Sequence, residues 1–132
     1  MTHPYLPGLD HGSLVSQMTT LESILRRVIG KFPTYMRPPF LAVDGLVLST
    51  MAELGYHVIG ASTDTKDYEN DAPDLIHRSI ERFRGEFGAG GSVVLAHDVH
   101  YHTVNVLVPA MLREVRDRGL IRMWSFFFFF FF

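Results

Sequence analysis

Three groups of polar side chains, each at the end of a short apolar segment, are the residues of this chain best suited to chemistry. Arg37 follows the first segment, Asp64 and Asp67 follow the second, and His97 and Asp98 follow the third. If the segments are parallel strands, their carboxyl ends meet at one edge of a sheet, and these side chains converge on one rim. An arginine, carboxylates and a histidine placed together suit acid–base catalysis or metal-assisted hydrolysis.

Each of these residues also has a purely structural interpretation. Arg37 is equally suited to a structural ion pair. Asp64 and Asp67 bracket a loop rich in turn-forming residues, where aspartate often bonds its own backbone. His97 directly follows small and apolar residues, so it also fits a partly buried histidine whose hydrogen bonds are satisfied.

The other histidines give weaker signals. We expect His100 and His102 to be exposed loop residues, although together with His97 they offer the alternative of a separate metal cluster. His3 taken alone cannot form a zinc site, because such a site needs three or more ligands. The remaining histidines have no partner at an informative spacing and are expected to be structural or solvated: His11, His57 and His77.

Hydrophobic periodicity predicts the helices of the first half of the chain. Apolar residues recur at helical spacing over 13–29, and Gly30 stands at the position of a C-cap. Asp44 is the expected N-cap of a second helix that ends before Gly55.

Two further helices are expected in the second half. One opens at Asp71 or Ala72 with Pro73 and places Ile76 and later apolar residues on one face. Another runs over about 103–118, where Pro109 should kink the first turn or delay the start of the regular helix. Short strands are expected within four segments: 32–36, 56–61, 92–96 and 119–124.

Helices and strands therefore alternate at short spacing, which predicts parallel strands joined by crossover helices. About four strands are too few for a closed parallel barrel of about eight βα units. The expected fold class is α/β, with this chain forming roughly half of a larger domain.

The composition is that of a globular protein and excludes several classes. Hydrophobic residues make up 47% of the 132 residues and the net charge is −2, so neither disorder nor nucleic-acid binding is indicated. The chain has no cysteine, which excludes disulfides and thiolate metal ligands.

The two ends of the chain carry no targeting signal that we can identify. No signal peptide begins the sequence, and no apolar run reaches the roughly 20 residues of a membrane span. Residues 126–132 are seven phenylalanines, which we interpret as an artefact of translation or of the gene prediction rather than as a real apolar appendage. We accordingly predict a domain over 1–120 and an unrelated tail over 121–132.

Four motifs, taken in order, give the chain a resemblance to a known family. Thr2–Pro4, Arg37–Phe40, Asp64–Tyr68 and Leu95–Asp98 resemble motifs two to five of the polysaccharide deacetylases, the carbohydrate esterases with the NodB homology domain. The likeness to fungal chitin deacetylases in particular lies in three longer runs: 35–40, 64–70 and 90–100. The resemblance covers 2 to about 120 and implies an N-terminally truncated, partial (β/α) barrel, roughly its C-terminal half.

The resemblance implies a role for each matching residue. His97 matches the general acid that protonates the leaving amine, Asp67 the carboxylate that pairs with it, and Arg37 the arginine that orients the catalytic base. A carboxylate beside a histidine stabilises its charged form, which suits an acid working near neutral pH.

Three residues match positions that contact the substrate. Phe40 stands where the family usually has tyrosine, and its backbone N–H would bind the oxyanion. Tyr68 stands where tryptophan is common and would form part of the groove wall, while Leu95 would line the pocket for the acetyl methyl group.

The metal side of the implied site is incomplete. In the family an aspartate and two histidines hold zinc or a similar divalent ion; His3 matches the second histidine, whereas the first and the Asp-Asp motif that includes the base have no match. We therefore predict that these 132 residues show no measurable deacetylation.

The implied reaction is removal of N-acetyl groups from chitin or a related N-acetylglucosamine polymer by a secreted or cell-wall-associated protein. The alternative hypothesis is a naturally shortened, non-catalytic carbohydrate-binding or interaction protein, in which Tyr68 and Trp124 contact sugar rings.

Overall fold

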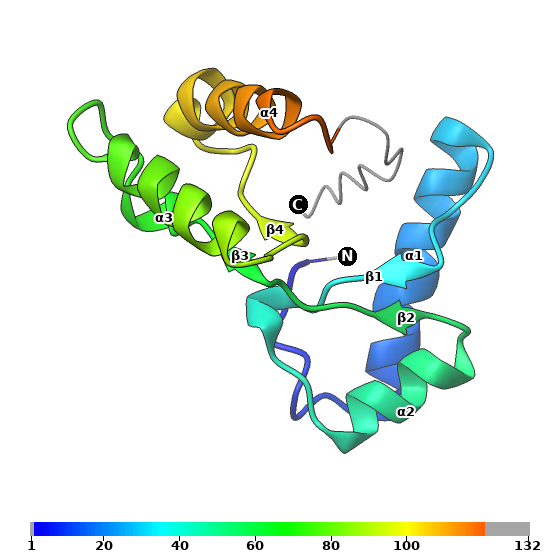
Figure 1. Ribbon diagram of the computed structural model, residues 1–132. Coiled ribbons are helices and arrows are strands. Elements are labelled where there is room, and N and C mark those ends of the chain that lie inside the picture. Colours follow the sequence, from blue (N-terminus) through cyan, green and yellow to red (C-terminus); the bar gives the residue numbers. More distant parts are fainter. Residues whose placement is uncertain (1, 121–132) are drawn as a thin grey trace. The chain divides into compact units, whose positions relative to one another are not determined.

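The computed structural model describes residues 2–120. Most of the strand expected at 119–124 and all of the phenylalanine run lie outside the described residues. The chain divides between Gly60 and Ala61 into two compact units (Figure 1). Each unit contains a pair of short parallel strands, which confirms the expected parallel pairing. That 1–120 form one domain stays a prediction.

The first unit is built on two helices that begin at capping aspartates. Helices α1 (His11–Ile29) and α2 (Gly45–Glu53) start where the side chain of Asp10 or Asp44 accepts a backbone N–H of the first turn. Gly30 ends α1 in the left-handed conformation, with φ of 74°. The caps expected at Asp44 and Gly30 are confirmed.

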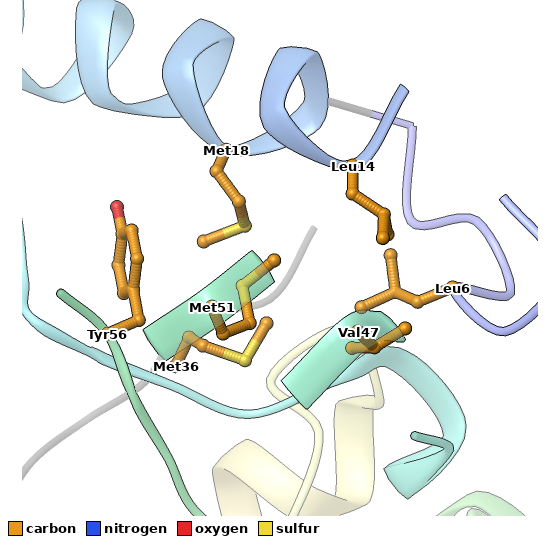
Figure 2. Packing of buried hydrophobic residues seen from close by; sticks show 7 residues of the cluster. All are labelled: Leu6, Leu14, Met18, Met36, Val47, Met51 and Tyr56. Atoms are coloured by element: carbon orange, nitrogen blue, oxygen red, sulfur yellow. The ribbon is translucent and has the colours of Figure 1, made fainter. Parts of the chain in front are cut away.

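In the first unit β1 (Tyr35–Met36) and β2 (His57–Val58) form a parallel pair, α2 packs on β2, and α1 packs on α2. Figure 2 shows the apolar side chains of this core, with three flexible methionines filling its middle. The buried members of the core are Leu6, Leu14, Met18, Met36, Val47, Met51 and Tyr56.

The second unit begins with a strand that the sequence did not predict. In place of one strand over 56–61, the chain forms β2 in the first unit and then β3 (Thr63–Asp64), which pairs in parallel with β4 (Val94–Leu95). The polar pair Thr63 and Asp64 resembles the start of a loop, so no apolar pattern marks it as a strand.

Helix α3 (Ile76–Gly88) begins later than expected, because the 3₁₀ turn η2 (Asp67–Glu69) and further turns occupy the preceding residues. The last helix has two parts, a π-helical turn η3 (Thr103–Leu107) and the α-helix α4 (Val108–Asp117). Pro109 lies at the start of α4, as its missing N–H requires, which confirms the expected late start. Within 2–120, no helix combines the length and the apolar character needed to cross a membrane.

Gly91 holds β4 close to β3. A Cβ atom there would collide with Thr63 Oγ1, with Glu86 O at 2.8 Å and with Ser62 O at 2.9 Å, whereas a Cβ at Gly85 in α3 meets nothing. We expect Gly91→Ala to lower the free energy of unfolding by about 1–3 kcal/mol, the usual cost of overpacking.

The matched control is Gly85→Ala, which should stabilise α3 by up to about 1 kcal/mol because alanine favours the helix. Urea unfolding followed by circular dichroism measures both changes. A Gly91→Ala variant as stable as the wild type would show that β3 and β4 do not need this close approach.

Candidate functional site

The structure brings Asp67 and His97 into direct contact in the second unit. Asp67 Oδ1 lies 2.8 Å from His97 Nδ1, and Asp67 Oδ2 accepts the backbone N–H of the same histidine at 2.5 Å. The carboxylate is fully buried, at 0% exposure, while the imidazole is 39% exposed. Because an ionised carboxylate only accepts hydrogen bonds, the proton of this contact belongs to Nδ1 of His97.

Strand register explains why these two residues meet. Asp64 of β3 lies opposite Leu95 of β4 in a parallel pair, so the chain leaves both strands at the same end. Three residues beyond Asp64 the chain reaches Asp67, and two beyond Leu95 it reaches His97. The expected convergence at the carboxyl ends of neighbouring strands is thus seen for this part of the site.

A third donor completes the surroundings of the buried carboxylate. Thr103 Oγ1 donates to Asp67 Oδ2 at 2.9 Å. Burial by itself raises the pKa of Asp67, but the hydrogen bonds from the His97 ring, from the His97 N–H and from Thr103 outweigh it, so the pKa lies below its ordinary value. Asp67 is therefore charged at neutral pH.

Tyr68 lies beside this pair, and Leu95 ends strand β4 two residues before His97. The ring of Tyr68 meets the His97 ring edge to face, with 5.4 Å between centroids, and is 43% exposed. The Leu95 carbonyl accepts the Thr65 hydroxyl at 2.8 Å, which fixes the end of β4. Their implied roles as groove wall and acetyl pocket stay predictions.

His100 and His102 are not the exposed loop residues that we expected. Both lie half-buried against Asp71, with Nδ1 of His100 3.3 Å from Oδ2 and Nδ1 of His102 3.0 Å from Oδ1. The His102 N–H also donates to Asp71 and is the main cause of the lowered pKa of that carboxyl. The hypothesis of a His97, His100 and His102 metal cluster finds no support, because no such grouping occurs among the described residues.

Arg37 lies at the corresponding place in the first unit, directly after β1. Its side chain is buried, at 7% exposure, and Nε and Nη2 both donate to the carbonyl of Gly60 at 3.3 Å. Burial lowers the pKa of the guanidinium. Within 2–120 no carboxylate pairs with Arg37, so the structural ion pair considered from sequence is not formed there.

His3 and Phe40 are neighbours in the first unit. Their rings meet edge to face, with centroids 5.2 Å apart. Phe40 and Leu41 both have left-handed backbones, with φ of 57° and 56°, a strained conformation for bulky residues. The following amides, from Leu41 and Ala42, fold back onto Pro38 and Pro39 carbonyls, and within the described chain the Phe40 N–H makes no hydrogen bond.

The described residues do not fit a catalytic zinc ion by themselves. Such a site takes three protein ligands and a water molecule, and within 2–120 no group of three or more histidine, aspartate or glutamate side chains could hold a metal. Family resemblance assigns one metal ligand among these residues, His3, and this assignment stays a prediction, so we derive no step that passes through a metal.

The predicted site residues therefore fall into two sets. Asp67, His97, Tyr68 and Leu95 belong to the second unit, whereas a further set belongs to the first: His3, Arg37 and Phe40. A shared cavity for both sets stays a prediction. The sequence analysis did not identify Thr103 or Asp71 as residues of this site. Two features pointed to Asp71: it lies four residues after Asp67, and His102 lies two residues after His100.

Comparison with known proteins identifies the family. Residues 1–59 match the sequence profile described as polysaccharide deacetylase. A "probable peptidoglycan-N-acetylglucosamine deacetylase" of Arthroderma benhamiae is 49% identical over 119 residues, covering 89% of this chain and 27% of that protein. A chitin deacetylase of a Pestalotiopsis species is 46% identical over 119 residues, covering 90% of this chain and 40% of that protein. The chain belongs to the polysaccharide deacetylase family.

A solved structure agrees with this assignment. The chitin deacetylase of the fungal pathogen Colletotrichum lindemuthianum matches with a TM-score of 0.83 and 40% identity, covering 89% of this chain and 54% of that one. The predicted fold, part of the deacetylase barrel, is confirmed. The chain spans between 27% and 49% of the length of four fungal relatives that it matches.

The lowered pKa of Asp67 predicts how stability depends on pH. With a folded pKa below the value of about 3.9 for an unperturbed aspartate, the carboxylate stabilises the fold above that pH. This contribution is lost as the pH falls through the folded value. We expect the free energy of unfolding to fall more steeply below about pH 4 in the wild type than in Asp67→Asn.

Urea unfolding at a series of pH values measures this slope. The control is Asp74→Asn, which removes an exposed carboxyl and should keep the wild-type slope. Parallel curves for the wild type and Asp67→Asn would contradict the charge state assigned to Asp67.

Proposed function

We propose that the protein to which this chain belongs removes N-acetyl groups from chitin or a related N-acetylglucosamine polymer, and that this chain supplies the acid side of the site. The observation that carries the proposal is the contact of 2.8 Å between the buried Asp67 carboxylate and His97 Nδ1. The names of its fungal relatives, which include chitin deacetylases, support the substrate class.

The proposed acid is His97. Amide hydrolysis expels an amine, a poor leaving group until a proton is added to its nitrogen. With Nδ1–H held by Asp67, Nε2 is the nitrogen through which His97 would pass a proton to the departing amine. Asp67 stabilises the imidazolium and fixes the ring, as a carboxylate does for the histidine of other hydrolytic sites.

Arg37 is proposed to orient the catalytic base. A guanidinium has five N–H donors, and in the described chain Arg37 uses its side chain only on the Gly60 carbonyl. A buried cation is costly unless paired, so a carboxylate from outside 2–120 is the partner that its burial favours. The family's base, an aspartate, has the required charge.

Phe40, Leu95 and Tyr68 are proposed to contact the substrate. A backbone N–H on a strained turn that makes no hydrogen bond within 2–120, as at Phe40, is suited to stabilise a developing oxyanion. Leu95 would receive the acetyl methyl group, and the exposed ring of Tyr68 would contact the sugar.

The proposal includes a divalent metal ion, zinc by family resemblance, with His3 as one of its ligands and the other ligands supplied from outside 2–120. It also includes the secreted or cell-wall-associated location that the family implies. Because these 132 residues offer a single matching ligand, we propose that this chain alone does not deacetylate.

An assay of the 132-residue chain on chitin oligomers with added zinc or cobalt tests the proposal that this chain alone does not deacetylate. We expect no acetate above the background without enzyme, because the base and most metal ligands are missing from the sequence. Clear acetate release would overturn it, and tight chitin binding without release would favour the alternative of a carbohydrate-binding protein.

A chimera tests the acid assignment. Residues 2–120 replace the matching segment of the Colletotrichum chitin deacetylase, a substitution favoured by 40% identity and a TM-score of 0.83. We expect the chimera to release acetate from chitin oligomers and His97→Ala to lower that rate about 10²–10⁴-fold, the usual contribution of a general acid.

The control is His77→Ala, which removes an exposed histidine of α3 and should leave the rate unchanged. An active chimera that tolerates His97→Ala would disprove the assigned role. A chimera that is folded yet inactive would argue against the proposed function of the segment as a whole.

A further inference from the structure

Thr103 is the part of the second unit whose role neither the family motifs nor the proposed chemistry explains. It is 1% exposed, and its hydroxyl donates to the fully buried carboxylate of Asp67 at 2.9 Å. The other donors to this carboxylate, the N–H and Nδ1 of His97, both come from one residue. Thr103 is thus the donor that holds Asp67 independently of His97.

The two oxygens of Asp67 are used differently. Oδ2 accepts both the His97 N–H and the Thr103 hydroxyl, while Oδ1 accepts His97 Nδ1 at 2.8 Å. Two donors on Oδ2 fix the rotation of the carboxylate about its Cβ–Cγ bond. That rotation decides where Oδ1 points, and so how the imidazole is oriented.

The backbone of η3 explains how Thr103 reaches this position. The N–H of Val108 donates to the carbonyl of Thr103, five residues earlier, a wider turn than in an α-helix. Pro109 has no N–H, and its ring would clash with the carbonyl four residues earlier. The wide turn accommodates Pro109, while fully buried Leu107 anchors it. Such turns inside helices often occur at functional sites.

We propose that Thr103 is a positioning residue for the acid pair: its hydroxyl fixes the carboxylate of Asp67, which in turn fixes the tautomer and ring orientation of His97. The inference rests on the proposed function only in treating His97 as an acid. Charged or titratable groups near the His97 ring among the described residues include Asp67, Tyr68 and His100, the last with its centroid 5.9 Å away and paired with Asp71.

The test follows the Nδ1 proton of His97 by NMR in the full chain, labelled with ¹⁵N-histidine. Thr103→Val keeps the shape of the side chain and removes the hydroxyl, so the downfield Nδ1 proton signal of His97 should broaden beyond detection or move upfield. Thr103→Ser keeps the hydroxyl and should restore the wild-type signal. A role in packing alone would give the opposite order of the two variants.

A matched control is Thr63→Val. Thr63 is also fully buried in the second unit, but its Oγ1 has no hydrogen-bond partner in the described chain, so the His97 signal should not move. If Thr103→Val does not fold, Thr103→Cys replaces it, because a thiol is a weaker donor of similar size and should shift the signal upfield. A His97 signal unchanged by loss or weakening of the Thr103 donor overturns the proposal.

The result is independent of deacetylation. A chimera without activity, together with a His97 signal that responds to Thr103, would reject the proposed function and retain the positioning role. An active chimera whose His97 signal does not respond to Thr103 would retain the proposed function and reject the positioning role.

Discussion

A carboxylate buried without contact to water is the constraint on which the second unit depends. Asp67 is fully buried, and an isolated charge in that position would be strongly destabilising. Three donors satisfy it, and they come from residues thirty or more positions along the chain. The loop after β3 and the loop after β4 are therefore joined by a contact that neither can lose without exposing or neutralising the charge.

Asp71, four residues after Asp67, makes a second connection of the same kind. As Asp67 does with His97, Asp71 accepts both the backbone N–H and the Nδ1 of His102. Two aspartates four residues apart thus hold the segment from His97 to Thr103 at both of its ends. The acid role that we propose for His97 requires accurate placement of the ring, and this double attachment gives the His97 loop fewer ways to move.

Local patterns in the sequence predicted local structure well. The caps at Asp44 and Gly30 and the delayed helix at Pro109 follow from stereochemistry within a few residues. Strand β3 was missed because two polar residues carry no period, and His102 was misjudged because its partner lies 31 positions away. The strand-end pattern predicted that Asp67 and His97 lie on one rim, but their direct pairing was expected only through family resemblance, because no spacing in a single sequence identifies which side chains on a rim touch.

The two sets of site residues differ in how complete they are. In the second unit the three donors to Asp67 lie within 61–103, so the contact between Asp67 and His97 forms from this unit's own residues. In the first unit Arg37 is buried without a carboxylate in 2–120, and His3 meets an aromatic ring in place of other metal ligands. The charge of Asp67 is therefore satisfied within its own unit, whereas the described residues supply no carboxylate for Arg37. This sequence therefore specifies the contact of Asp67 with His97 by itself. The roles that we propose for Arg37 and His3 need partner residues from outside 2–120.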